Sequence, residues 1–275
     1  MKFTKMQGCG NDYVYIDAIT NKIENASELA IKLSNRNYGI GSDGLILICS
    51  SEIADFRMDM YNADGSGSQM CGNGIRCLGK FVYDHGMTTK KELDIETPAG
   101  IKHLQLHDEN GKITSVTVDM GVPELEARKI PVNSDESPVL RRPITVGGCK
   151  FDVSCVSMGN PHAAVYVDDV SQLPMETIGP RFENHDFFPE RVNTEFVEIT
   201  DRKNIKMRVW ERGSGETMAC GTGACACAYV SMLNGFTDDE VSVSMRGGTL
   251  KIRFCREDGH IYMTGPAVTV FEGEL

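Results

Sequence analysis

Two cysteines, Cys71 and Cys220, open the same short motif in two parts of the chain. The motif reads Cys-Gly-Asn-Gly at residues 71–74 and Cys-Gly-Thr-Gly at residues 220–223, and a glycine-rich turn precedes each copy. A run of small and apolar residues follows, so we expect each thiol to lie at the start of a helix. The first amide groups of a helix lack internal partners and carry partial positive charge, which favours a thiolate. Either cysteine could therefore serve as a base near neutral pH.

Two such thiols suit the inversion of a carbon centre. Inversion by proton transfer requires a base on one face of the carbon and an acid on the other, and one thiolate with one thiol supplies both. If the two helix starts face one cleft, the amides of Gly72, Asn73, Gly221 and Thr222 could bind a substrate carboxylate together. The same amides would stabilise the carbanion, because no metal cluster or glycine-rich nucleotide fingerprint is evident as an electron sink.

The elements that must position these thiols are repeated at an offset of 149 residues. Strand-like runs at 13–17 and 56–62 correspond to runs at 163–168 and 205–211, and the two Cys-Gly-x-Gly motifs follow in the same order. Alternating runs from residue 92 and from residue 240, each with a glycine eight positions on, predict a hairpin after each helix. Several matches at one offset indicate an internal duplication.

The duplication predicts an α+β fold of two pseudo-symmetric lobes, each a mainly antiparallel sheet wrapped round one central helix, with the active site in the cleft between them. We expect residues 1–118 to form the N-terminal lobe, to which the C-terminal segment 266–275 returns. Residues 119–265 would form the C-terminal lobe.

The composition of the chain limits the kinds of molecule that it is expected to bind. A net charge of -11 argues against nucleic acid and against an anionic membrane surface, and favours a small-molecule substrate. Polar residues interrupt the first 20 positions, so we expect no secretory signal and a cytoplasmic protein. The charge-free stretch 217–237 is built of small residues, which favours a buried helix over a membrane span.

Ten cysteines in a cytoplasmic chain should be reduced thiols. The cluster at 220, 225 and 227 lacks paired C-x2-C spacing and a nearby histidine, so we expect no metal site. Outside the two motifs we expect inert, buried side chains at Cys9, Cys49, Cys77, Cys149, Cys155, Cys225, Cys227 and Cys255.

Five segments spread along nearly the whole chain resemble the diaminopimelate epimerase family, whose members interconvert LL- and meso-2,6-diaminopimelate in lysine and peptidoglycan synthesis. They are Met-Gln-Gly-Cys-Gly-Asn-Asp at 6–12, Asn-Ala-Asp-Gly-Ser at 62–66 leading to the first motif, Ser-Met-Gly-Asn-Pro-His at 157–162, Arg-Val-Asn at 191–193, and Glu-Arg-Gly-Ser-Gly-Glu-Thr at 211–217 leading to the second.

The resemblance implies an isomerase without pyridoxal phosphate or metal, usually a homodimer, with Cys71 and Cys220 as the catalytic acid-base pair. Gly72, Asn73, Gly221 and Thr222 would present amides to the carboxylate at the reacting centre. The implied substrate contacts are Asn11, Asn62, Asn160, Asn193, Glu211 and Arg212, and the implied supporting polar residues are His162 and Glu211.

One position departs from the family pattern. Many members carry Gln where this chain has Gly44, so that side-chain contact is in doubt. Each asparagine could also be a turn or cap residue, and His162 a structural histidine.

Other functions remain open from the residues alone. A proline or hydroxyproline racemase-type isomerase would use the same fold. A non-catalytic amino-acid-binding protein or a thiol redox protein could use the same two cysteines.

Overall fold

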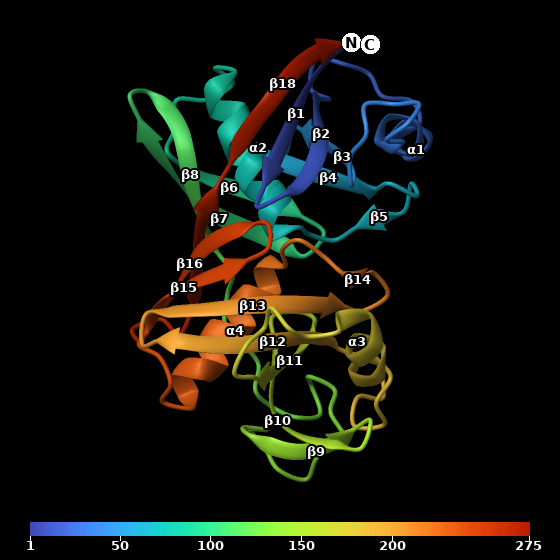
Figure 1. The fold of residues 1–275 in the computed structure, drawn as a ribbon. Coiled ribbons are helices and arrows are strands. Elements are labelled where there is room, and N and C mark those ends of the chain that lie inside the picture. Colours follow the sequence, from blue (N-terminus) through green and yellow to red (C-terminus); the bar gives the residue numbers. More distant parts are fainter. The chain divides into compact units, whose positions relative to one another are not determined.

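The computed structural model describes all residues 1–275 and divides the chain into two compact units. Unit 1 comprises Met1–Asp119 and Thr264–Leu275, and unit 2 comprises Met120–Met263 (Figure 1). Each unit is a sheet with helices, so the α+β class expected from the sequence is confirmed. No helix is long and apolar enough to cross a membrane.

Unit 1 contains two helices, α1 (Ala26–Ser34) and α2 (Gly72–Asp84). Its strands are β1 (Lys2–Gly8), β2 (Asn11–Asp17), β3 (Gly44–Cys49), β4 (Phe56–Asn62), β5 (Gly67–Ser68), β6 (Glu92–Thr97), β7 (Gly100–Glu109), β8 (Lys112–Asp119) and β18 (Val268–Glu274). Most neighbouring strands are antiparallel, whereas β2 runs parallel to β3 and β4 parallel to β6. The C-terminal strand β18 pairs with β1, so both chain ends lie in this unit.

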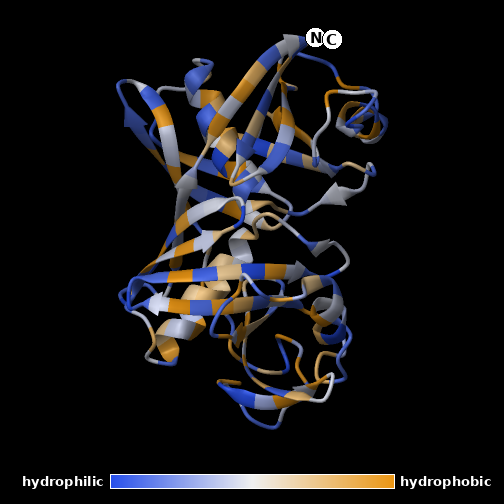
Figure 2. Cartoon of the chain, viewed as in Figure 1, coloured by the Kyte–Doolittle hydropathy of each residue, from blue (hydrophilic) through white to orange (hydrophobic).

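Unit 2 repeats this plan with helices α3 (Met175–Glu183) and α4 (Gly221–Leu233). Its strands are β9 (Arg142–Val146), β10 (Cys149–Ser157), β11 (Pro161–Tyr166), β12 (Asn193–Asp201), β13 (Asn204–Glu211), β14 (Gly215–Glu216), β15 (Glu240–Met245) and β16 (Gly248–Phe254). The strand β17 (Ile261–Pro266) passes from unit 2 into unit 1. Hydrophobic and hydrophilic residues interchange along β12 and β13 (Figure 2), as expected for strands with one buried face.

The pairing of strands follows the same 149-residue offset in both units. In unit 1, Tyr13 of β2 pairs with Gly44 of β3; in unit 2, the parallel pair β11 and β12 sets His162 opposite Asn193. Both pairs keep the 149-residue offset, as do Leu45 opposite Tyr61 and Thr194 opposite Trp210. Equivalent residues of the two units can therefore be compared one by one.

The helices that begin after the two motif cysteines are the buried ones. Nearly every residue from Gly72 to Val82 of α2 is buried, and α4 buries small residues such as Ala224, Ala226 and Ala228. The charge-free stretch 217–237 thus contains a helix packed within its own unit, against the strands of that sheet. Glycine and alanine allow the sheet to approach a helix closely.

Each unit has a second helix, α1 or α3, which the sequence did not predict because nine-residue helices leave little periodic signal. The expectation of buried, inert cysteines is wrong for Cys149, which is exposed in β10, and for Cys49 and Cys255, which are partly exposed. All three lie where a strand begins or ends: Cys49 is the last residue of β3, Cys149 is the first of β10, and Cys255 follows β16 directly.

Candidate functional site

Each motif cysteine caps its helix with its own sulfur. Cys71 and Cys220 both have extended backbones and occupy the N-cap positions of α2 and α4. The amide of Gly74 donates to Cys71 Sγ at 3.3 Å, and the amide of Gly223 donates to Cys220 Sγ at 3.4 Å. N-caps are ordinarily Ser, Thr, Asp or Asn, whose oxygens accept this bond well. A sulfur in the same place becomes a strong acceptor only as a thiolate, so the geometry favours the ionised form.

In unit 1 the thiol lies within a group of amide side chains. The Cys71 thiol donates to Asn11 Oδ1 at 3.2 Å, and Asn73 Nδ2 donates to the same oxygen at 3.4 Å. Asn11 is held from its other end, where its Nδ2 donates to Asp43 Oδ2 at 2.7 Å. Asn62 ends β4, and its Nδ2 donates to Ser66 Oγ at 3.0 Å. The structure thus links Cys71, Asn11 and Asn73 directly, with Asn62 at the end of a neighbouring strand.

Opposing influences act on the pKa of Cys71. Burial raises the pKa of this thiol above its usual value. The amides of Gly74 and Asn73, the Arg76 guanidinium and the Tyr13 hydroxyl all lower it, because each favours the thiolate.

In unit 2 the thiol lies among carboxylates. Cys220 is buried, and its Sγ lies 3.4 Å from Thr222 Oγ1. Burial raises the pKa of Cys220 well above its usual value, and the carboxylates of Glu211 and Glu195 raise it further. Burial likewise raises the pKa of Glu211, whose Oε1 accepts a hydrogen bond from Thr217 Oγ1.

The remaining expected residues of unit 2 form two hydrogen-bonded groups. Asn193 Oδ1 accepts the backbone amide of Arg212 at 2.9 Å, and the Arg212 guanidinium donates to Glu190 O. His162 lies between two partners, with Nδ1 2.7 Å from Glu195 Oε1 and Nε2 2.9 Å from Asn160 Oδ1. Arg212 makes no ion pair with Glu211, so its charge remains available to a bound anion.

The sequence analysis missed two charged residues of these sites, Glu195 and Arg76. Both are completely buried. Glu195 lies in the otherwise uncharged run Thr-Glu-Phe-Val of β12, and Arg76 lies in the run Gly-Ile-Arg-Cys-Leu of α2. A single charge inside an apolar run is the signal that could have found them, because a buried charge is costly unless specific partners are built around it.

At Gly44 the structure leaves no space for a side chain. A Cβ atom there would lie 2.1 Å from Tyr61 O and 2.8 Å from a ring carbon of Tyr13. The backbone of this chain therefore cannot accept a side chain at this position without rearrangement.

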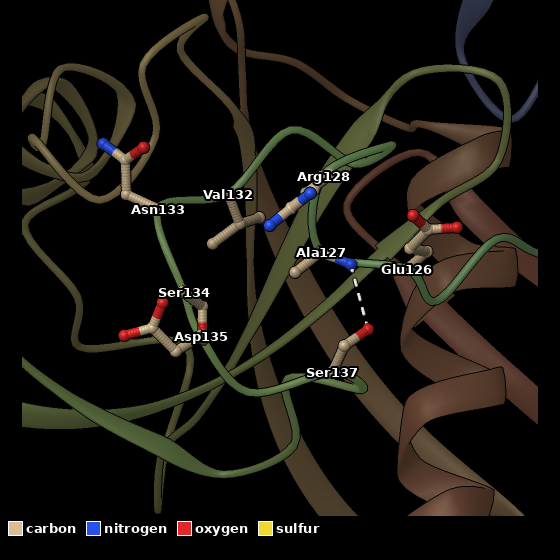
Figure 3. A pocket seen from close by; sticks show the side chains of 8 residues that line it. All are labelled: Glu126, Ala127, Arg128, Val132, Asn133, Ser134, Asp135 and Ser137. Carbon is tan, nitrogen blue, oxygen red and sulfur yellow. Dashed lines mark hydrogen bonds between the residues drawn. The ribbon is translucent and has the colours of Figure 1, made fainter.

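A pocket of about 570 Å³ opens elsewhere in unit 2, in the segment between β8 and β9 (Figure 3). One hydrogen bond crosses it, from the Ala127 amide to Ser137 Oγ at 3.2 Å. None of the expected site residues lines it; its lining is Glu126, Ala127, Arg128, Val132, Asn133, Ser134, Asp135 and Ser137. No group of three or more His, Cys, Asp or Glu side chains is arranged to hold a metal ion.

Solved structures of related fold come from several isomerase and biosynthetic proteins. A PhzF-family phenazine biosynthesis protein from Bacillus anthracis matches with a TM-score of 0.69 at 20% identity, covering 100% of this chain and 98% of that one. A hydroxyproline epimerase from Agrobacterium vitis matches with a TM-score of 0.67 at 15% identity, covering 100% and 90%. At such identities the likeness concerns the fold alone.

Sequence comparison is more specific and confirms the family resemblance. The family model described as diaminopimelate epimerase matches residues 3–126 and 154–270. A diaminopimelate epimerase of Methanococcus maripaludis is 56% identical over 100% of this chain and 99% of its own length. One from Acetivibrio thermocellus is 55% identical over 100% and 98%. The chain belongs to the diaminopimelate epimerase family.

Proposed function

We propose that this protein interconverts LL- and meso-2,6-diaminopimelate by moving a proton at the α-carbon between Cys71 and Cys220. The observation that carries the proposal is that both thiols occupy the same N-cap position at equivalent points of two duplicated units. Family membership supports diaminopimelate as the substrate.

In the proposed reaction the α-carbon of the substrate exchanges protons with both thiols. The thiolate of one cysteine takes the α-proton, and the thiol of the other delivers a proton to the opposite face, so the thiols exchange protonation states in each turnover. Amides at the starts of α2 and α4, from Gly72, Asn73, Gly221 and Thr222, would bind the carboxylate next to the carbanion. This scheme uses protein groups only and needs neither pyridoxal phosphate nor metal.

The other expected residues bind or support the substrate in this proposal. Asn11, Asn62, Asn160, Asn193, Glu211 and Arg212 would hold the amino and carboxylate groups of the two amino-acid heads. His162 supports the site by fixing the Asn160 side chain, which its Nε2 contacts at 2.9 Å. Gly44 contributes no side-chain contact, because its surroundings exclude one.

The decisive assay incubates the purified protein with LL-diaminopimelate in deuterium oxide. We expect the meso epimer to form with one solvent deuterium at the inverted carbon, measured by chiral chromatography and mass spectrometry. Parallel incubations use L-proline and trans-4-hydroxy-L-proline, on which we expect no exchange. Exchange on a proline instead would identify a racemase of the same fold, and binding of diaminopimelate without any exchange would identify a binding protein.

We further propose a cytoplasmic homodimer. The ten cysteines are all free thiols, which supports a reducing compartment. The outer strand β18 exposes the apolar side chains of Val268, Val270 and Phe271, which supports a surface for a second copy. Sedimentation equilibrium should give twice the 30.3 kDa chain mass, and a purely monomeric protein would contradict this proposal.

A further inference from the structure

Arg76 places a buried positive charge beneath the helix turn that Cys71 opens. Its side chain is 0% exposed. Long helical side chains point back toward the N-terminus, and here Nη1 donates to Gly72 O at 3.1 Å and Nη2 to Asn73 Oδ1 at 2.9 Å. Nε donates to Pro266 O at 3.2 Å, which fixes the guanidinium from the other side.

This position is unfavourable for a cation in the absence of an anion. The N-terminal turn of a helix already carries partial positive charge, so an arginine there is repelled by the helix dipole. Complete burial adds a large desolvation penalty. An anion at the same turn would offset both costs, and a Cys71 thiolate would be such an anion. Arg76 acts on the sulfur through space, and its charge lowers the pKa of Cys71. The Asn11 amide oxygen, which accepts from the Cys71 thiol at 3.2 Å, acts in the opposite sense.

The equivalent turn of unit 2 lacks this cation. The 149-residue offset carries Arg76 onto Cys225, a buried neutral thiol. The same offset carries Asn62 onto Glu211, so a carboxylate of unit 2 replaces a neutral amide of unit 1.

The surroundings of the fourth residue of each motif differ in the same sense. A Cβ atom on Gly74 would lie 2.6 Å from Ile46 Cδ1, whereas one on Gly223 would lie 2.5 Å from Glu195 Oε1. Residues 46 and 195 are equivalent, so a methyl group in unit 1 is replaced by a carboxyl group in unit 2.

The charges facing the two thiols can now be compared. His162 Nδ1 lies 2.7 Å from Glu195 Oε1, and the carboxylates of both Glu211 and Glu195 act on Cys220. The titratable or charged groups that act on Cys71 are Arg76, Tyr13, Tyr15 and Cys77. Arg76 Nη2 also donates to Cys9 Sγ at 3.8 Å, but burial raises the pKa of Cys9 and keeps that thiol protonated near neutral pH. Those that act on Cys220 or its carboxylates are Glu211, Glu195, His162 and Cys227.

We propose that Arg76 makes Cys71 the more readily ionised thiol of the pair, and therefore the first to act as the base, while Cys220 is the thiol that holds its proton. Arg76 is thus a positioning residue that breaks the symmetry of the duplication. Its part in turnover rests on the proposed function, but the two protonation states can be measured without any substrate. The pKa of both thiols is raised by burial; Arg76 opposes this rise at Cys71, whereas Glu211 and Glu195 increase it at Cys220.

The test measures iodoacetamide alkylation of each cysteine by peptide mass spectrometry over a series of pH values. Only thiolates react, so the pH midpoint of the rate reports ionisation, and limited access lowers the rate without moving the midpoint. In the wild-type protein we expect the Cys71 midpoint at a lower pH than that of Cys220. In Arg76→Met the loss of the cation should move the Cys71 midpoint up by about one unit, which is roughly tenfold slower alkylation at neutral pH.

Matched variants separate charge from structure. Arg76→Lys keeps the charge and should retain most of the wild-type profile of Cys71. Glu211→Gln should lower the Cys220 midpoint and leave Cys71 unchanged. A wild-type Cys220 midpoint at or below that of Cys71 would overturn the proposal even if Arg76→Met fails to fold. So would a folded Arg76→Met protein with an unchanged Cys71 profile. If these midpoints behave as expected but diaminopimelate is not epimerised, the proposed function alone fails.

Discussion

Cys71→Ala should abolish epimerisation, with kcat at least about 10³-fold lower, and Cys220→Ala should do the same. General acid-base groups commonly contribute 10²–10⁴-fold, and here inversion cannot be completed when either face of the carbon lacks its group. The measurement is meso-diaminopimelate formation from the LL epimer at saturating substrate. Cys77→Ala is the matched control, because position 77 is equivalent to Ala226 of the other unit.

In each single variant, exchange of the α-proton with solvent deuterium should continue although inversion of the α-carbon is lost. With one thiol left, the α-proton on that side can still be removed and returned, so deuterium should enter one epimer without inversion. Each variant should therefore label a different epimer. Wild-type epimerase activity in either variant, or loss of activity in Cys77→Ala alone, would contradict the two-thiol mechanism.

Glu195→Ala should lower the free energy of unfolding of unit 2 by about 3–5 kcal/mol. The carboxyl group is the partner of His162 Nδ1 at 2.7 Å, and both side chains are 0% exposed. Removing one member of a buried pair leaves the other without its partner, which costs this amount in other proteins. Urea unfolding followed by fluorescence measures the change in unit 2 directly, because Trp210 is the only tryptophan.

Unit 1 supplies the control for this prediction. The residues equivalent to His162 and Glu195 are Tyr13 and Ile46, which pack without a charged pair. The double variant His162→Tyr with Glu195→Ile should regain most of the lost stability, since buried pairs can often be replaced by well-packed side chains. It should nevertheless remain impaired in epimerisation, because Asn160 would lose its contact with His162. Recovery of full activity would show that the pair serves stability alone.

Glu195 also illustrates how a buried carboxyl group is maintained. Its Oε2 makes no hydrogen bond within the protein. A buried carboxyl group with one unsatisfied oxygen is costly, so the hydrogen bond between its Oε1 and His162 Nδ1 is needed to lower the penalty. Glu195→Gln, which preserves the shape and can still contact His162, should cost far less than Glu195→Ala in the same unfolding experiment.

Much of the fold was predictable because its signals are local. Alternating apolar residues at 56–62 and 205–211 predicted β4 and β13, and a run of small residues after each Cys-Gly-x-Gly motif predicted α2 and α4. Comparison at one offset then predicted two equivalent halves, which strand register confirms. The short helices α1 and α3 escaped prediction, since nine residues span too few turns to establish a period.

The two thiols, their motif and the family were determined by the sequence itself. Chemistry that depends on residue type and on spacing along the chain, such as a cysteine preceding a helix, can be read without coordinates. The difference in ionisation between the two thiols could not be read from the sequence. It depends on which side chains of distant segments lie beneath each turn: Ile46 and Arg76 in unit 1, Glu195 and Glu211 in unit 2. Electrostatic effects on a thiol depend on distance through space and on burial, and only the tertiary structure sets both.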